Sequence, residues 1–458
     1  MKRFLAFDLA RLFIGPLQLT PRGIDRVEIG YLRHFLYHWP GDCVGILPTP
    51  WGARIVARDR AIALLQDVLA GWHEEISPSD DAVSESVWRW IGSQDAFDAT
   101  SLPAGRQTHL ATAIFTMLGR LGLAASSSSA AQRLPKGALY LNIGQVGLAI
   151  PQFLSWLGRR PDVSPVFMLH DTIPIDHSEF VPPLALRFHR KMIENTARHA
   201  SGLIVTTDAA RADIMRALRP YDREDIPVLA APLPVGAEFA RDADRPWSPG
   251  GYFVIAGSIE PRKNHALLLA VWRALIERHG AQAPKLVVAG TVSRGHDVIK
   301  QALNDFPQMR RHVVEVKGIS TPSLSRLMRG AYAVLMPSFA EGFGLPIVEA
   351  LAVGTPVIAS DIPAHREAGG DYAAYIAPTD EEGWRAAVES HVSQWAAHRK
   401  RLETYRPLRW TDYFQRIEPF LFSAGIGTAV TTPAASGGGI VRTEPAAGQG
   451  AILEELPI

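Results

Sequence analysis

Cysteine is nearly absent from this sequence, which has one, Cys43, among 458 residues. A single cysteine excludes a disulfide within the chain and favours a reducing compartment such as the cytoplasm. Neither sign of charge is in excess, because 47 Lys and Arg face 46 Asp and Glu, giving a formal net charge of +1. A chain this close to neutrality has no overall attraction for nucleic acid, so nucleic acid is not an expected partner.

Long apolar runs are also missing. No stretch of about 18 uncharged apolar residues occurs, so no membrane-spanning helix is expected. Lys2 and Arg3 precede an apolar stretch, as in a signal peptide, but Asp8 and Arg11 interrupt it. Peripheral contact with the inner face of a membrane stays open.

One segment bears on that question. Leu110–Leu123 is apolar, and Arg106 and Arg120 lie within or beside it. A basic amphipathic helix of this kind can lie in a membrane interface, which would suit a lipid-linked acceptor. The alternative is a helix that covers the core of the first domain.

What the chain does contain is enough apolar sequence for two domains, with 47% hydrophobic and 20% charged residues. Strand and helix patterns alternate in two halves, which predicts an α/β protein with two doubly wound, Rossmann-like domains facing across a cleft. A helix is expected over Gly147–Trp156, whereas residues 74–105 are polar and turn-rich. The expected parts are an N-terminal domain (1–240), a linker (241–250), a C-terminal domain (251–405), a terminal helix that crosses back (406–422) and a disordered tail (423–458).

The most informative stretch is residues 331–360. Its pattern predicts a strand over Ala331–Met336, a small flexible loop over Ser338–Gly344 and a helix over Pro346–Val353. A helix that begins after a glycine-rich loop offers unpaired N–H groups and the positive end of its dipole, and both favour phosphate. Gly342 and Gly344 let a ligand approach the backbone closely.

Two carboxylates bracket that predicted phosphate site. Glu341 lies in the loop, and Glu349 lies eight positions later in the helix. A carboxylate repels phosphate but accepts hydrogen bonds from hydroxyl groups, so this pair suits the hydroxyls of a sugar and of a ribose. A ligand with hydroxyls on both sides of a diphosphate is a nucleotide sugar.

Further polar groups follow other predicted strands. Arg262 and Lys263 lie in the first loop of the C-terminal domain, where two cations suit a diphosphate. In the N-terminal domain, Gly23 ends a glycine-containing loop before a helix, and His170 follows the strand Val166–Leu169 with Asp171 next to it. The alternatives are an ordinary strand-to-helix turn at Gly23 and a structural pair of His170 with Asp171.

The pattern Glu341-Gly-Phe-Gly-Leu-Pro-x-x-Glu349 resembles the E-x7-E motif of family 4 retaining glycosyltransferases, which have the GT-B fold. The segments HDTIPI and EPRKN resemble this family's histidine-bearing and phosphate-binding segments, and the whole set is most similar to bacterial polysaccharide mannosyltransferases. The family often has an arginine where this chain has Ser258, which leaves Arg262 and Lys263 as the visible diphosphate cations.

The resemblance implies metal-independent, retaining transfer of a hexose, with GDP-mannose as the preferred donor, no cofactor, and a saccharide or polyprenyl-diphosphate-linked saccharide as acceptor. It implies catalytic roles for Glu341, His170, Lys263 and Arg262. The implied donor-binding residues are Gly23, Arg262, Lys263, Gly318, Glu341, Gly342, Phe343, Gly344, Leu345 and Glu349.

Two other functions stay open. A nucleotide-sugar epimerase shares this architecture, and a non-catalytic partner protein can keep the fold without the reaction. The tripeptide Asp242-Ala243-Asp244 matches the D-x-D of metal-dependent sugar transferases, but it lies in a charged linker rather than after an apolar strand. No metal site is therefore expected.

Overall fold

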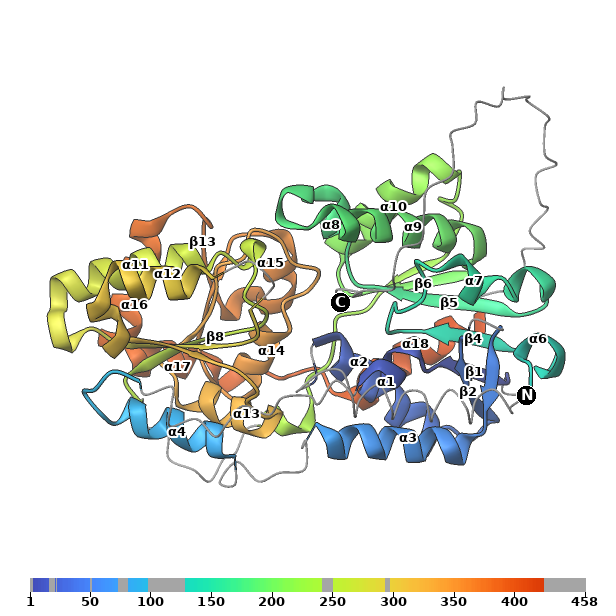
Figure 1. The fold of residues 1–458 in the computed structure, drawn as a ribbon, viewed down its shortest axis with the longest axis horizontal. Helices are drawn as coiled ribbons and strands as arrows, with labels where there is room; N and C mark the ends of the chain where they lie inside the picture. Colours follow the sequence, from blue (N-terminus) through green and yellow to red (C-terminus); the bar gives the residue numbers. More distant parts are fainter. Residues whose placement is uncertain are drawn as a thin grey trace, which may run out of the picture.

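The computed structural model describes residues 3–15, 21, 23–49, 52–72, 81–97, 128–240, 250–292 and 297–423. Within them the chain forms two β-sheets, each flanked by helices (Figure 1). The segment Leu110–Leu123, the tripeptide at 242–244 and the tail from 424 onward lie outside the described residues, so the expectations for them stay predictions.

The first sheet has seven strands in the order β3-β2-β1-β4-β5-β6-β7. All neighbours are parallel except β3, which pairs antiparallel with β2 at the edge. Its strands are β1 (Leu5–Asp8), β2 (Cys43–Leu47), β3 (Arg54–Val56), β4 (Leu139–Asn142), β5 (Ser164–Leu169), β6 (Gly202–Val205) and β7 (Val228–Ala230). Its helices are α1 (Ala10–Ile14), α2 (Gly23–Arg33), α3 (Arg58–Gly71), α6 (Ala130–Arg133), α7 (Pro151–Leu154), α8 (Ile173–Asp176), α9 (Pro183–His199) and α10 (Asp208–Leu218).

The second sheet has six parallel strands in the order β10-β9-β8-β11-β12-β13. They are β8 (Tyr252–Ala256), β9 (Lys285–Ala289), β10 (Val313–Val316), β11 (Val334–Met336), β12 (Val357–Ser360) and β13 (Ala374–Ile376). The helices that follow are α11 (His265–His279), α12 (Val298–Asp305), α13 (Thr321–Gly330), α14 (Leu345–Ala352), α15 (Pro363–Gly369), α16 (Glu381–Ser393), α17 (Trp395–Lys400) and α18 (Trp410–Ser423). Strand order reverses between β8 and β11, which is the position where open α/β sheets bind their ligands.

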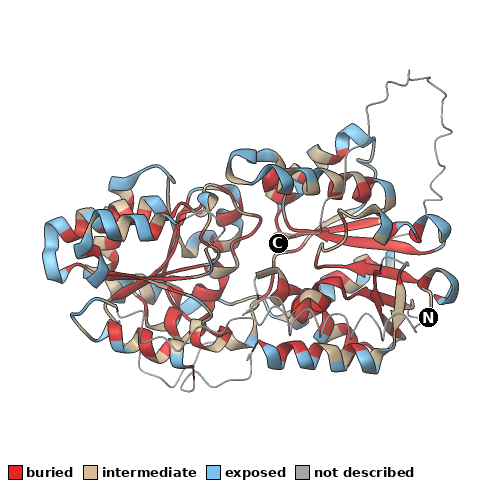
Figure 2. Ribbon diagram, viewed as in Figure 1, coloured by how far each residue is buried: buried red, intermediate tan, exposed pale blue. Residues whose placement is uncertain are grey.

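The central strands are buried along their whole length (Figure 2). Parallel strands carry helices on both faces, so both sets of side chains pack in a core. This is why β8 is apolar throughout, and β5 is apolar after Ser164, instead of alternating with polar residues.

Helix α4 (Ala82–Ile91) departs from the expected division of the chain, because it packs on the second domain. The ring of Trp88 meets that of Tyr252 edge to face at 5.8 Å. Lys285 of β9 donates hydrogen bonds to carbonyls at the end of α4, among them Ile91 O at 3.2 Å. The prediction of a turn-rich connection was wrong here, because Asp81 caps the helix by accepting from the backbone N–H of Val83 at 3.1 Å.

The expected helix over Gly147–Trp156 is also wrong over most of its length. Only Pro151–Leu154 is α-helical, and turns precede it. Gln145 has φ 63° and Gly147 has φ 86°, so the backbone is left-handed where a helix would have to begin.

Helix α18 ends the described chain on the first domain, beside α2. The hydroxyls of Tyr31 and Tyr413 lie 2.7 Å apart, and His34 Nε2 lies 2.9 Å from Glu418 Oε1. The two ends of the described sequence therefore pack into one core.

Direct contacts join the two domains. The hydroxyls of Thr206 and Thr207, after β6, donate to the carbonyl of Gly342 at 2.8 and 3.1 Å. The carboxylate of Glu367 on α15 accepts from the backbone N–H groups of Asp208 and Ala209 at 2.7 and 2.8 Å. Glu367 thus stabilises the N-terminus of α10 from across the domain boundary.

Candidate active site

The loops after β8 and β11 bring one carboxylate and two cations together. Glu341 Oε2 lies 2.8 Å from an Arg262 guanidinium nitrogen, and Glu341 Oε1 pairs with Lys263 Nζ. Ser338 Oγ donates to the same Oε1 at 2.7 Å. The strands β8 and β11 flank the point where strand order reverses, which is where open α/β sheets bind ligands. Three residues proposed from the sequence as catalytic therefore form one cluster.

In this cluster, the neighbouring charges affect the pKa of Glu341 and of Arg262 more than burial does. The Glu341 side chain is only 7% exposed. Burial raises the pKa of Glu341, but Arg262 and Lys263 together hold it well below its usual range. For Arg262, burial lowers the pKa, and Glu341 with Glu260 raises it above its usual value. Glu341 is therefore an ionised carboxylate at neutral pH, held between two cations.

Gly342 and Gly344 place the backbone of the motif loop. A Cβ added at Gly342 would lie 2.4 Å from the His170 carbonyl oxygen, so only glycine lets the first domain come this close. Gly344 has φ +99°, in the left-handed region that favours glycine, and α14 begins at the next residue. In the first turn of α14, Pro346 has no N–H and the Ile347 N–H donates to the Gly344 carbonyl at 2.9 Å, so the loop and the helix start are tied together.

Glu349 lies one turn into α14 and has a different partner. Its Oε1 is 2.9 Å from Arg26, which belongs to α2 of the first domain. Burial raises the pKa of Glu349, and Arg26 partly offsets this. Its second oxygen, Oε2, is buried without a hydrogen-bond partner among the described residues. That oxygen is therefore an unused acceptor enclosed by protein atoms.

His170 lies at the carboxyl end of β5, as the sequence predicted, but its ring is not directed to Asp171. The ring Nε2 is 3.2 Å from the Ile143 carbonyl oxygen, whereas Asp171 Oδ1 accepts from the Ile173 N–H at 3.1 Å. Burial lowers the pKa of His170 to about 4, so the imidazole is neutral at physiological pH. The main-chain carbonyl of His170 is the part nearest Gly342.

The remaining proposed residues lie in different surroundings. Gly23 begins α2, and a Cβ there would lie 3.2 Å from Leu345 Cδ1, so this loop contacts the motif. Phe343 is buried in the hydrophobic cluster of the first domain and anchors the loop there. Gly318 has φ +72° and follows β10, with no other residue within 4 Å of an added Cβ. No hydrogen bond among the described residues links Gly318 to the Glu341 cluster.

Two residues near the motif carried no local signal in the sequence. Arg26 lies in a helix whose partner, Glu349, is hundreds of positions away. His365 of α15 is fully buried, and its Nδ1 lies 3.1 Å from the Ser360 carbonyl oxygen. Its Nε2 has no partner among the described residues, and its ring lies 3.2 Å from a Cβ built on Gly344. Burial lowers the pKa of His365 to about 4, so a neutral imidazole faces the glycine loop.

A second cluster of charged residues lies next to the carboxyl end of β1 in the first sheet. Arg11 donates to Asp25 Oδ1 and to the Gly144 carbonyl, both at 2.8 Å. Asp8, at the end of β1, is buried, and burial raises its pKa to about 7. Burial likewise raises the pKa of Glu28 well above its usual value. This cluster holds protons near neutral pH, unlike the Glu341 cluster.

Neither a metal site nor a membrane span is found in the part of the chain that the structure describes. Those residues contain no group of three His, Cys, Asp or Glu side chains placed to hold a metal ion. None of the helices described is both long and apolar enough to cross a membrane.

Residues 250–394 match the protein family described as Glycosyl transferases group 1. The matched segment contains all six strands of the second sheet and the cluster of Arg262, Lys263 and Glu341. The second domain is therefore a group 1 glycosyl transferase domain, which confirms the resemblance noted in the sequence.

Relatives with this domain include enzymes named as mannosyltransferases. The chain is 26% identical over 223 residues to the O-antigen chain mannosyltransferase RfbU of Salmonella typhimurium, covering 48% of this chain and 59% of that protein. It is 33% identical over 147 residues to the serotype-specific mannosyltransferase WbdA of Escherichia coli, covering 31% of this chain and 18% of that protein. The matches thus span less than two thirds of either relative.

The whole architecture matches a solved structure. The crystal structure of Anabaena Alr3699/HepE in complex with UDP-glucose aligns with a TM-score of 0.57 at 15% identity, covering 92% of this chain and all of that chain. The two doubly wound domains are those of the GT-B fold, so the predicted fold class is confirmed.

Proposed function

We propose that this protein is a glycosyltransferase that moves a hexose from a nucleotide-sugar donor to a saccharide or a lipid-linked saccharide in surface polysaccharide synthesis. The observation that carries the proposal is the pairing of Glu341 with Arg262 and Lys263 beside the glycine loop that opens α14. Cations, the N-terminus of a helix and carboxylates meet there at the edge of a group 1 glycosyl transferase domain, and these are the groups that suit a nucleotide sugar.

Each group has a proposed role that follows from its charge. Arg262, Lys263 and the first N–H groups of α14 stabilise the negative charge on the departing diphosphate. Glu341 accepts from hydroxyls of the transferred hexose, and Glu349 accepts from the ribose through Oε2. His170 lines the other face of the hexose from the first domain, whose closure excludes water.

The proposed transfer retains the anomeric configuration and uses neither a metal ion nor a cofactor. The acceptor hydroxyl attacks from the face on which the diphosphate leaves, and the two cations supply the positive charge that a metal ion supplies elsewhere. Activity should therefore be unchanged by a strong chelator, and nuclear magnetic resonance of the product should show the donor's anomeric configuration.

GDP-mannose is the proposed donor, with a saccharide or polyprenyl-diphosphate-linked saccharide as acceptor. The support is the name mannosyltransferase borne by RfbU and WbdA, together with the likeness of the HDTIPI, EPRKN and EGFGLP segments to such enzymes.

The deciding experiment is calorimetry of the full chain against a panel of nucleotide sugars, followed by transfer assays with the donors that bind. Binding of one donor and its transfer to an acceptor support the proposal. Conversion of the donor in the absence of acceptor would indicate an epimerase instead. Binding of no nucleotide sugar, and no thermal stabilisation by any, would indicate a non-catalytic protein.

A further inference from the structure

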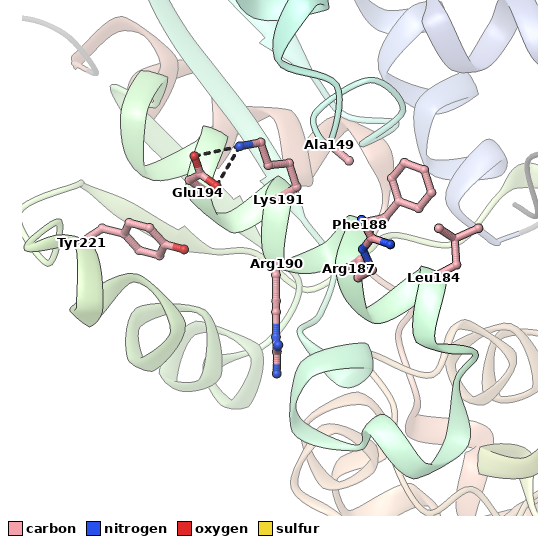
Figure 3. A pocket seen from close by; sticks show the side chains of 8 residues that line it. All are labelled: Ala149, Leu184, Arg187, Phe188, Arg190, Lys191, Glu194 and Tyr221. Atoms are coloured by element: carbon pink, nitrogen blue, oxygen red, sulfur yellow. Dashed lines mark hydrogen bonds and ion pairs between the residues drawn. The ribbon is translucent and has the colours of Figure 1, made fainter. Parts of the chain in front are cut away.

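A hollow of about 450 Å³ lies beside α9 and is lined mostly by residues of this helix (Figure 3). Leu184 and Phe188 lie at one end of it, and Tyr221 lies at the other. Its lining combines three cationic and three large apolar side chains: Leu184, Arg187, Phe188, Arg190, Lys191 and Tyr221.

Positive charge at this hollow is not neutralised locally. Arg187 and Arg190 are exposed, and neither side chain has an ion pair within the described ranges. Lys191 shares its charge with Glu194, whose two carboxylate oxygens each lie 2.9 Å from Nζ. The lining therefore carries a surplus of positive charge in a chain whose formal total is only +1.

Apolar exposure is concentrated at the same place. Among the described residues, three large hydrophobic side chains are exposed, and two of them, Leu184 (42%) and Tyr221 (41%), line this hollow. Apolar side chains beside unpaired arginines suit a ligand that has an anionic head and an apolar body.

The segment that leads into α9 contacts the loop that carries Glu341. Phe180, three residues before α9, stacks on Phe339 of the motif loop with ring centroids 5.5 Å apart. A surface that bound this face would therefore lie near the loop that carries Glu341.

We propose that this face of α9 docks the protein on a lipid bilayer that contains anionic phospholipid. Arg187 and Arg190 contact the headgroup phosphates, while Leu184 and Tyr221 enter the interface. The inference extends the proposed function, because a bilayer-bound enzyme meets a lipid-linked acceptor directly. Vesicle binding is measured without donor or acceptor. A failure of the docking proposal is therefore distinguishable from a failure of the proposed glycosyl transfer.

The test is sedimentation of the full chain with vesicles of phosphatidylglycerol mixed with an excess of phosphatidylcholine. Arg187→Ala/Arg190→Ala should lower the vesicle affinity on the order of 30-fold, because each cation near an anionic surface contributes about 1 kcal/mol. Leu184→Ser should lower it roughly 10-fold through lost apolar insertion. The matched control, Arg211→Ala/Arg273→Ala, removes two exposed arginines from α10 and α11 and should bind like the wild type.

Equal binding of wild type and Arg187→Ala/Arg190→Ala would overturn the proposal. So would a loss of binding in Arg106→Glu/Arg120→Glu alone, which would assign the contact to the segment predicted from the sequence. Binding that phosphatidylcholine vesicles reproduce, or that inorganic phosphate abolishes at constant ionic strength, would also overturn it, since the occupant would then not be an anionic bilayer. Unchanged transfer to a soluble acceptor in the α9 variants would show that they are folded.

Discussion

The two carboxylates of the motif, Glu341 in the loop and Glu349 in α14, have different partners. At one end, Glu341 is paired with two cations from its own domain, and its pKa is held far below the usual range. At the other end, Glu349 is paired with Arg26 from the opposite domain, and burial raises its pKa. The first carboxylate keeps its partners however the domains are arranged. The second depends on a residue of the other domain, so its pairing depends on how the two domains are placed.

The largest expected effect is at the Glu341 end. Lys263→Ala and Glu341→Ala should each lower the transfer rate on the order of 1,000-fold, because each removes a preorganised charge from the reacting groups. Initial rates with the donor found by calorimetry measure this.

The matched control for this prediction is Lys317→Ala, which removes a lysine of the same domain paired with Glu315 at 3.0 Å but half exposed. It should retain the wild-type rate, and circular dichroism should show all three variants folded. Full activity in both site variants would refute the assignment of the site.

The next effect tests closure itself. Gly342→Ala places a methyl group 2.4 Å from the His170 carbonyl, so the loop and the first domain must separate. Displacing reacting groups by about 1 Å can cost roughly 100-fold in rate, which is the loss expected here. Small-angle scattering should show a larger radius of gyration than in the control Gly158→Ala, where an added Cβ meets nothing within 4 Å. An unchanged rate and radius would mean that closure does not pass through this contact.

A smaller effect is expected at the Glu349 end. Arg26→Ala removes the cation that partly offsets the burial of Glu349, so the pKa of Glu349 rises further. A protonated Glu349 no longer offers the donor ribose a charged acceptor. We therefore expect the donor KM to rise about 10-fold, with kcat changed less. The loss of donor binding on acidification should begin at a higher pH than in the wild type. Arg33→Ala, on the same helix but half exposed, is the control. A donor KM unaltered at every pH would contradict the coupling.

The smallest effect separates the two carboxylates by the pH dependence of stability. The folded pKa of Glu341 is lowered, so its contribution is present above the unfolded value of about 4.3 and is lost as pH falls, at about 1.4 kcal/mol per pH unit. The folded pKa of Glu349 is raised, so its contribution is present below about 4.3 and is lost as pH rises to the folded value. Urea unfolding between acid and neutral pH gives the free energy of unfolding of the wild type minus that of each variant. This difference should rise with pH for Glu341→Gln and fall with pH for Glu349→Gln. Parallel curves would show that the two sites are electrostatically alike.

The same contrast explains what the sequence could reveal. The cluster around Glu341 was predictable because it depends on local signals, namely two strands, a glycine loop and a helix start within one domain. The GT-B fold followed from these signals and from the family resemblance. Arg26, His365, Thr206 and Thr207 act on the loop only through tertiary contacts between distant segments, which no local pattern records.

Helix α4 was missed for a related reason. Its Trp88 and Trp90 form an apolar face, but that face packs on a domain that begins far later in the chain. The domain boundaries proposed from the sequence assumed that residues near in sequence share a core. The partner of a single side chain can be equally unpredictable from the sequence. The ring of His170 lies against the backbone carbonyl of Ile143 rather than the adjacent Asp171.

The position of α4 has a practical consequence for recombining such proteins. Residues 81–97 lie on the second domain, while the described segments on either side, up to residue 72 and from residue 128, lie on the first. Excising residues 250–423 as an independent unit would strip α4 from it, leaving Tyr252 uncovered and the amine of Lys285 without the carbonyls that it contacts. A chimaera that exchanges donor domains between relatives should therefore transplant the two discontinuous pieces together.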